Sequence, residues 1–190
     1  AGVGTTDSGV DRGGSAEKYV VHRPDTFVGR EIIVPRSEHE SELARYPERA
    51  GTWALHALRA AAAVPQLHWE TYHKTLPHEI GWIGPGVQLA KGCYRGQETV
   101  ARVHNLGHPP RRLVLLHLDG SEHGLPVHGD LVLNPEGKEI GFIGTPARHH
   151  ELGPIATAVI KRSTPADQEL RIEHEGSIIT ATQELVLAGK

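Results

Sequence analysis

The part of this chain that follows residue 110 consists of short apolar runs separated by turn-forming residues. Glycine, proline, asparagine and aspartate stand between the runs and break any long helix. Short strands at this spacing are typical of a small antiparallel sandwich or barrel. The sequence therefore predicts an all-β region with strands at residues 112–118, 130–133, 139–143, 155–161, 169–174 and 177–182.

The preceding part of the chain mixes helical and extended patterns. Ser37 and Glu40 have the spacing of a capping box, which predicts a helix that ends near Tyr46, before Pro47. Strong helix formers fill residues 52–63, and Pro65 supplies the stop. Glycine and proline make residues 76–87 a structured loop. β-Branched and aromatic residues predict strands at residues 19–22, 30–34 and 67–72.

These patterns together predict an α+β chain with three parts. Residues 1–17 are rich in glycine, serine, threonine and aspartate, a composition typical of a flexible segment. Residues 18–108 are expected to form part of an α+β domain, and residues 109–190 a C-terminal β-barrel domain. The boundary is placed where Pro109 and Pro110 follow Gly107, a helix-ending residue.

Composition narrows the partners and the compartment of the protein. The formal net charge of −3 gives no basic footprint for nucleic acid, so no direct nucleic-acid contact is expected. The longest apolar runs are too short to cross a bilayer, so no membrane contact is expected. A single cysteine, Cys93, is compatible with a reducing compartment, and the cytoplasm is the expected location. The absence of methionine fits either a start inside a longer protein or removal of an initiator.

The most unusual segment is KGCYRGQE at residues 91–98, which places the cysteine between two glycines ahead of a helical run. Gly92 and Gly96 permit backbone conformations that let the main chain turn sharply or approach a ligand. A helix beginning near Gln97 would direct unpaired amide hydrogens toward this segment and favour a thiolate. Cys93 is therefore either a reactive thiol or a buried inert one.

This segment resembles the K-G-C-Y-x-G-Q-E signature of the YgfZ-type branch of the glycine-cleavage T-protein (aminomethyltransferase) superfamily. The similarity extends to LPHEIGW before it and to RRLVLLHLDG and GKEIGFIGTPARHHELGPIATAVIKR after it. The resemblance implies the C-terminal half of a T-protein-like folate-binding protein, with an α+β domain followed by a small antiparallel β-barrel. The motif residues that carry over are Lys91, Gly92, Cys93, Tyr94, Gly96, Gln97 and Glu98.

The resemblance implies that tetrahydrofolate or a derivative is the cofactor. Glu79 is the expected pterin contact, because a carboxylate can accept two hydrogen bonds from the pterin edge; the alternative is a solvated loop acid. Aromatic faces could come from Tyr94 and Trp82, which are equally good core residues. The remaining expected contacts are Lys91 and Gln97 of the motif and, for the anionic folate tail, Arg102, Arg111 or Arg112.

The implied function is support of iron–sulfur cluster assembly or repair in client enzymes, including a tRNA-modifying one. The implied partners are folate, iron–sulfur client proteins or assembly factors, and a missing N-terminal half or second chain. One alternative is an aminomethyltransferase that transfers a one-carbon unit to tetrahydrofolate. Another is an interaction module with a vestigial folate pocket. His104, His108, His149 and His150 match no metal-binding motif, so no metal site is predicted.

Overall fold

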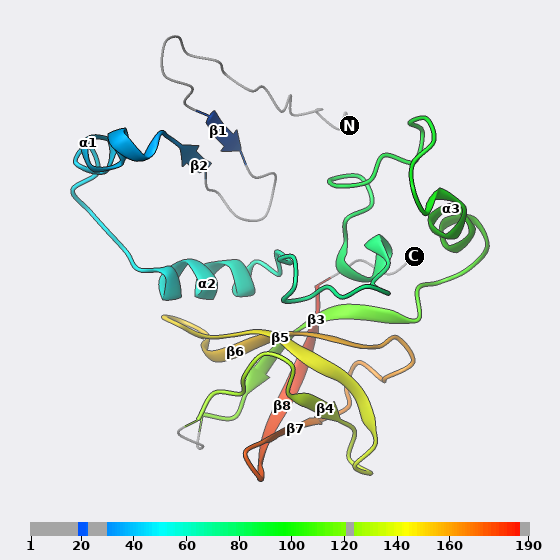
Figure 1. Ribbon diagram of the computed structural model, residues 1–190. Helices are drawn as coiled ribbons and strands as arrows, with labels where there is room; N and C mark the ends of the chain where they lie inside the picture. The colour runs from blue at the N-terminus through cyan, green and yellow to red at the C-terminus, as the bar shows by residue number, and fades with distance from the viewer. Residues whose placement is uncertain (1–18, 23–29, 121–123, 187–190) are drawn as a thin grey trace, which may run out of the picture. The chain divides into compact units, whose positions relative to one another are not determined.

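The computed structural model describes residues 19–22, 30–120 and 124–186 of the chain (Figure 1). Its contacts divide the chain into two compact units, Ala1–Thr52 and Trp53–Lys190, and each is described by itself. The predicted flexible segment at residues 1–17 lies outside the described residues. The predicted domain limits at residues 18–108 and 109–190 stay a prediction.

The first unit contains a hairpin and a short helix. The two predicted strands are present as β1 (Tyr19–His22) and β2 (Arg30–Ile33), and they pair antiparallel. A 3-10 turn, η1 (Arg36–Glu38), precedes helix α1 (His39–Leu43). The predicted capping box is wrong, because the N-cap of α1 is Glu38 and the Ser41 hydroxyl donates to the Glu38 carbonyl at 2.8 Å. The helix also ends before Tyr46, whose amide closes a tighter turn on the Leu43 carbonyl.

The second unit is built on a closed antiparallel barrel. Neighbouring strands follow the order β3-β6-β5-β4-β7-β8 around it. Each strand contains most or all of one predicted run, so the predicted α+β class and barrel are confirmed. The strands are β3 (Arg111–Leu118), β4 (Leu131–Leu133), β5 (Glu139–His149), β6 (Gly153–Lys161), β7 (Leu170–His174) and β8 (Ser177–Leu185).

Aliphatic side chains fill the barrel. Alternate positions point inward along an antiparallel strand, which is why the apolar residues of each run meet at the barrel centre. The fully buried members of this core are all apolar: Val114, Leu116, Val132, Ile143, Ala156, Ala158, Ile160, Leu170 and Ile172.

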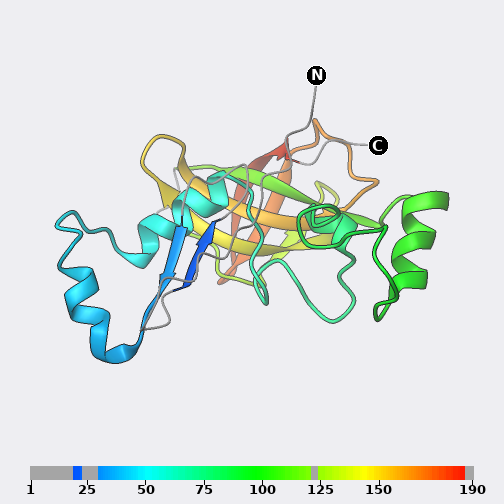
Figure 2. The ribbon, with the colours of Figure 1, turned by 90° about the horizontal axis from the view of Figure 1, so that it is seen from above.

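A layer of helices and loops covers one outer side of the barrel. It contains helix α2 (Thr52–Ala61), the 3-10 turn η2 (Pro77–Ile80) and helix α3 (Gln97–Leu106). Helices α2 and α3 lie at opposite ends of this layer (Figures 1 and 2). Ala57 and Ala60 of α2 pack on Leu115 of β3, and Ile80 of η2 packs on Leu113. The layer is therefore attached to the barrel by small apolar contacts.

The predicted strand at residues 67–72 is wrong. This segment forms turns, in which the amides of Trp69 and Glu70 both donate to the Gln66 carbonyl. His68 adopts a positive φ of 70°, which a strand does not allow. The Glu70 carboxylate also accepts the Gln66 amide at 2.6 Å, so a side chain replaces the sheet ladder as hydrogen-bond partner.

A buried polar network joins the layer to the barrel. Glu70 has no exposed surface, and one of its carboxylate oxygens accepts the hydroxyls of Thr145 at 2.5 Å and Thr157 at 2.6 Å. Arg59 of α2 lies 3.5 Å from the other oxygen and donates to the Val64 carbonyl at 2.7 Å. Thr145 sits where the β5–β6 register shifts, and such an irregularity re-aims side chains.

Candidate functional site

The segment around η2 contains the carboxylate that the sequence analysis singled out. Glu79 has no exposed surface, so its interpretation as a solvated loop acid is wrong. Its carboxylate accepts the Leu76 amide at 3.2 Å and the Arg111 Nε–H at 3.3 Å. Both distances exceed the usual 2.9–3.0 Å, and a carboxylate has about four acceptor positions, so Glu79 keeps acceptor capacity.

Arg111 connects Glu79 to an aromatic ring. Its guanidinium carbon lies 4.6 Å from the ring centroid of Tyr72, a cation–π distance. The Arg111 side chain is one quarter exposed, whereas Glu79 is fully covered. Arg111 is therefore the member of this ion pair that a ligand can reach from solvent.

An aromatic pocket of about 550 Å³ lies beside this pair. It is lined by Tyr72 and Trp82, and by Pro77 and Ile80 on either side of Glu79 in the sequence. Its volume is in the range of small-molecule sites, and the two aromatic side chains suit a flat ring. Trp82 also packs on Ile80 and Leu113, as the predicted core role requires, and its contact with a ligand stays a prediction.

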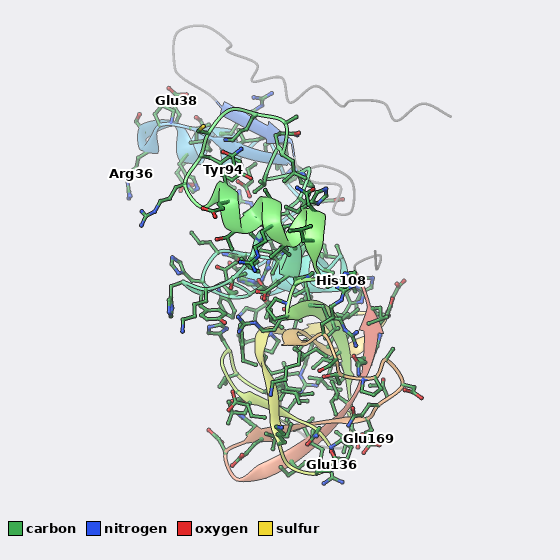
Figure 3. All side chains as sticks on the ribbon, turned by 90° about the vertical axis from the view of Figure 1, so that its right-hand side faces the viewer. Arg36, Glu38, Tyr94, His108, Glu136 and Glu169 are labelled. Carbon is green, nitrogen blue, oxygen red and sulfur yellow. The ribbon has the colours of Figure 1, made fainter. Side chains whose placement is uncertain are left out.

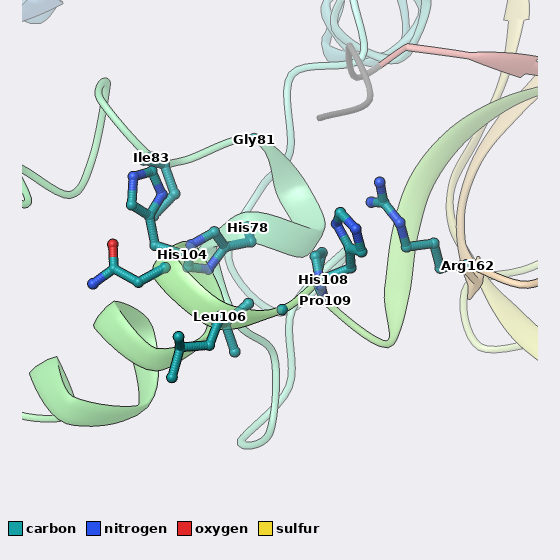
Figure 4. Close-up of a pocket in the computed structure, with 11 residues that line it drawn as sticks. His78, Gly81, Ile83, His104, Leu106, His108, Pro109 and Arg162 are labelled. Atoms are coloured by element: carbon teal, nitrogen blue, oxygen red, sulfur yellow. The ribbon is translucent and has the colours of Figure 1, made fainter.

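A second pocket of about 590 Å³ is lined by other residues of the same segment, His78, Gly81 and Ile83 (Figure 4). His78 and His104 lie side by side in it, with ring centroids 5.9 Å apart. His108 and Arg162 also line it. Burial, and then the nearby His104, lower the pKa of His78, so its imidazole is held neutral. Both His78 ring nitrogens are buried without a hydrogen-bond partner among the described residues.

The cysteine motif forms an exposed loop ahead of α3. Cys93 is exposed, so the interpretation as a buried inert thiol is wrong. Lys91 and Gly92 are exposed too, and the Lys91 ammonium lies 5.3 Å from the centroid of the half-buried Tyr94 ring. Tyr94 stands just before α3 in space (Figure 3). The structure thus presents the thiol to solvent.

The predicted helix after the motif is confirmed. Gly96 caps it with a positive φ of 84°, followed by a half-buried Gln97 and an exposed Glu98. The C-terminal residues of α3, from Val103 to Leu106, line the second pocket, which contains His78 and His104. At 1.5 Å per residue, α3 spans about 15 Å, which separates the motif from that pocket. Neither of the two pockets described above is lined by Cys93.

The three predicted arginines differ in their surroundings. Arg102 on α3 is exposed, and Arg111 is engaged with Glu79. Arg112 donates to the carbonyls of Arg162 at 3.1 Å and Thr164 at 2.7 Å. Burial, followed by the charge of Arg162, lowers the pKa of Arg112. The Arg112 guanidinium thus joins strand β3 to the loop between β6 and β7, and its contact with a folate tail stays a prediction.

Among the residues that the structure describes, no group of three or more histidine, cysteine, aspartate or glutamate side chains is placed to hold a metal ion. His149 Nδ1 instead accepts the amides of Glu151 and Leu152, both at 3.2 Å. In the same part of the chain, none of the helices has the length and apolar character needed to span a bilayer.

Sequence reasoning missed Glu70, Arg59, Tyr72 and His78. One signal for Arg59 was available, because it and His56 are the only strongly polar side chains within residues 53–63. A single arginine in an otherwise apolar helix indicates a buried partner. No comparable local signal identifies Glu70, whose partners come from distant strands.

Comparison with known proteins identifies partial relatives. No known protein-family profile matches the chain. It is 28% identical over 125 residues to the tRNA-modifying protein YgfZ of Aliivibrio fischeri, covering 64% of this chain and 38% of the relative. It is 28% identical over 163 residues to the YgfZ of Edwardsiella ictaluri, covering 83% and 46%. The chain thus spans less than half the length of these relatives.

A solved structure has the same fold. The glycine cleavage system aminomethyltransferase T from Bartonella henselae matches with a TM-score of 0.69 and 20% sequence identity. The match covers 89% of this chain and 49% of the aminomethyltransferase. The barrel and its covering layer therefore form a T-protein-like fold.

Proposed function

We infer that this chain, which has a YgfZ-type T-protein-like fold, is part of a tetrahydrofolate-binding protein that acts in the cytoplasm and supports tRNA modification. The residues at 18–108 would supply most of the folate contacts, and the barrel at 109–190 would support them and contribute Arg111. Both curated relatives reported above are named for tRNA modification. The finer proposal is that the protein maintains iron–sulfur clusters in a tRNA-modifying client enzyme.

The observation that carries the folate proposal is the Glu79–Arg111 pair beside the aromatic pocket. A pterin has a flat ring that stacks on aromatic side chains and an edge with adjacent N–H donors. Tyr72 and Trp82 offer the faces, and Glu79 has unused acceptor positions for the edge. Displacement of Arg111 would expose Glu79 and free a guanidinium for a carboxylate of the folate tail.

The site is proposed to be shared with further polypeptide. Within the described residues Glu79 is covered, and the motif residues Lys91, Tyr94 and Gln97 stand outside the aromatic pocket. The relatives are more than twice as long as the part of them that this chain matches. A second half, either joined to this chain or separate, would bring a further wall to the pocket.

Replacement of Trp82 by leucine is expected to weaken binding of 5-formyl-tetrahydrofolate roughly tenfold, because ring stacking is worth about 1–3 kcal/mol. The measurement is calorimetric titration of the protein expressed from its own gene. Trp82→Phe keeps an aromatic face and should retain most of the affinity. Trp53→Leu, at a tryptophan that is 89% exposed, should change it less than twofold.

The other outcomes of this titration distinguish the rival functions. Absence of heat with the unaltered protein contradicts folate binding and favours an interaction module with a vestigial pocket. If Trp53→Leu weakened folate binding as much as Trp82→Leu does, the assignment of the folate ring to the aromatic pocket would be contradicted. Production of methylene-tetrahydrofolate from an aminomethyl donor would identify an aminomethyltransferase instead.

The exposed thiol carries the iron–sulfur proposal. A Cys93→Ser variant in cells is expected to lower the activity of iron–sulfur client enzymes severalfold, because serine keeps the shape but not a soft sulfur donor. The measurement is client-enzyme activity and the level of the modified tRNA base at equal protein abundance. Arg95→Gln, at an exposed neighbour in the same loop, is the matched control. Undiminished activity of the client enzymes in cells that carry Cys93→Ser would contradict a role of the Cys93 thiol in iron–sulfur maintenance.

A further inference from the structure

Helix α3 is attached to the rest of its unit through the 3-10 turn η2. Among the described helices and strands, η2 is the element that α3 contacts most, and Val100 is the one buried residue of the helix. An element with so few buried side chains lies at the low-stability end of a fold and can open locally. The cysteine motif runs directly into the N-terminus of α3, so a loosening of α3 reaches the loop that carries Cys93.

Two histidines meet where these elements touch. His78 comes from η2 and His104 from the last turn of α3. Their rings lie side by side, with centroids 5.9 Å apart and planes inclined by 32° (Figure 4). Both His78 ring nitrogens are buried without a partner in the part of the chain that the structure describes. No hydrogen bond of the His78 ring within that part fixes the pair, so the contact depends on the packing of two uncharged rings.

The pocket around the pair holds basic side chains and no acidic one among the described residues that line it. His108 belongs to the loop after α3, and Arg162 directly follows strand β6. Glu79 is adjacent to His78 in the sequence, but its carboxylate is engaged by Arg111. A proton added to His78 would therefore meet positive or neutral neighbours in this pocket.

Acid acts on this contact in one direction. Burial, and then the nearby His104, lower the pKa of His78 from the ordinary value of 6.5. The unfolded chain therefore takes up this proton more readily than the folded chain does. The stability that neutral His78 contributes is complete above pH 6.5 and is lost as the pH falls from there toward the lowered pKa.

We propose that His78 and His104 form a proton-operated latch on α3. Uncharged, the two rings pack together and hold α3 against η2; protonated, they repel each other and release the helix together with the cysteine motif at its N-terminus. Two like charges in a partly buried pocket are unfavourable, and separation of the two elements hydrates both rings. The latch is independent of the folate and iron–sulfur proposals, because it needs neither a ligand nor the thiol.

Hydrogen exchange in the protein expressed from its own gene tests the latch. Mass spectrometry of the α3 peptide gives its protection at about pH 7.5 and about pH 5, relative to the intrinsic exchange rate at each pH. Protection of α3 is expected to fall about tenfold or more in acid, while that of strand β6 changes less than about twofold. His78→Phe keeps a flat ring without a proton site, so it should make the protection of α3 independent of pH in this range.

The matched control is His150→Phe, at the turn after strand β5. The His150 ring also lies beside a histidine, with its centroid 4.4 Å from that of His149, but its side chain is 68% exposed. This variant should keep the full fall in α3 protection in acid. His104→Gln removes the other proton site of the latch and should abolish the fall as His78→Phe does, so either variant suffices where the other does not fold.

Three results would overturn the latch. Equal protection of α3 at both pH values would show that acid does not act on the helix. An equal fall in β6 would show a general loosening of the unit in acid. A fall that persists in His78→Phe or in His104→Gln would assign the proton to another group. If neither variant folds, the comparison of α3 with β6 in the unaltered protein still decides.

Discussion

Replacement of Glu70 by alanine is expected to lower the free energy of unfolding by about 3–5 kcal/mol, the cost of breaking a buried ion pair from one side. The substitution would leave Arg59, 4% exposed, without its carboxylate partner. It would also remove the acceptor of the Thr145 and Thr157 hydroxyls and of the Gln66 amide. The measurement is urea unfolding of the 190-residue chain followed by circular dichroism.

The matched control is Glu184→Ala on strand β8. Glu184 is 60% exposed and pairs with His117 at 3.0 Å on the barrel surface. Exposed pairs contribute little, so a change below about 1 kcal/mol is expected. If Glu70→Ala lowered the free energy of unfolding no more than Glu184→Ala does, the buried network would not be what attaches the layer to the barrel.

A Gly141→Ala substitution is expected to cost about 3 kcal/mol or to prevent folding of the barrel. Gly141 pairs with Ile160 across strands β5 and β6. An added methyl group would fall on the Val159 carbonyl oxygen and 2.8 Å from the Ile160 Cα, both of which are main-chain atoms. The backbone of two paired strands would have to move apart, because neither atom can rotate away.

Gly107→Ala is the control for this prediction. A methyl group there meets no atom within 4 Å, and its φ of −155° is open to any residue. Thermal unfolding should therefore place Gly107→Ala within about 0.5 kcal/mol of the unaltered chain. Wild-type stability of Gly141→Ala would show that β5 and β6 are less closely paired than the structure describes.

The barrel was accessible to sequence reasoning because its signals are local. Apolar runs such as residues 112–118 and 155–161 alternate with turn residues, and each strand formed where its run lies. The wrong strand at residues 67–72 shows the limit of this reasoning. Its side chains suit a strand, but the tertiary partners of Glu70 stabilise turns instead.

The candidate site was accessible only in part. Glu79, Trp82 and Cys93 were singled out from motifs, and the structure adds that the first is covered and the last exposed. The contact of Arg111 with both Glu79 and Tyr72 joins residues that are far apart in the chain. Such a contact depends on how the layer sits on the barrel, which no local pattern encodes.

The sequence by itself determined where the barrel strands lie, and it located the cysteine motif ahead of a helix. Those properties follow from side-chain periodicity and from turn and cap residues that act within a few positions. Only the tertiary structure decided which charges are buried and which apolar side chains face water. Burial of Arg59 and Glu70, for example, depends on partners such as Thr145 and Thr157, which lie distant in the chain.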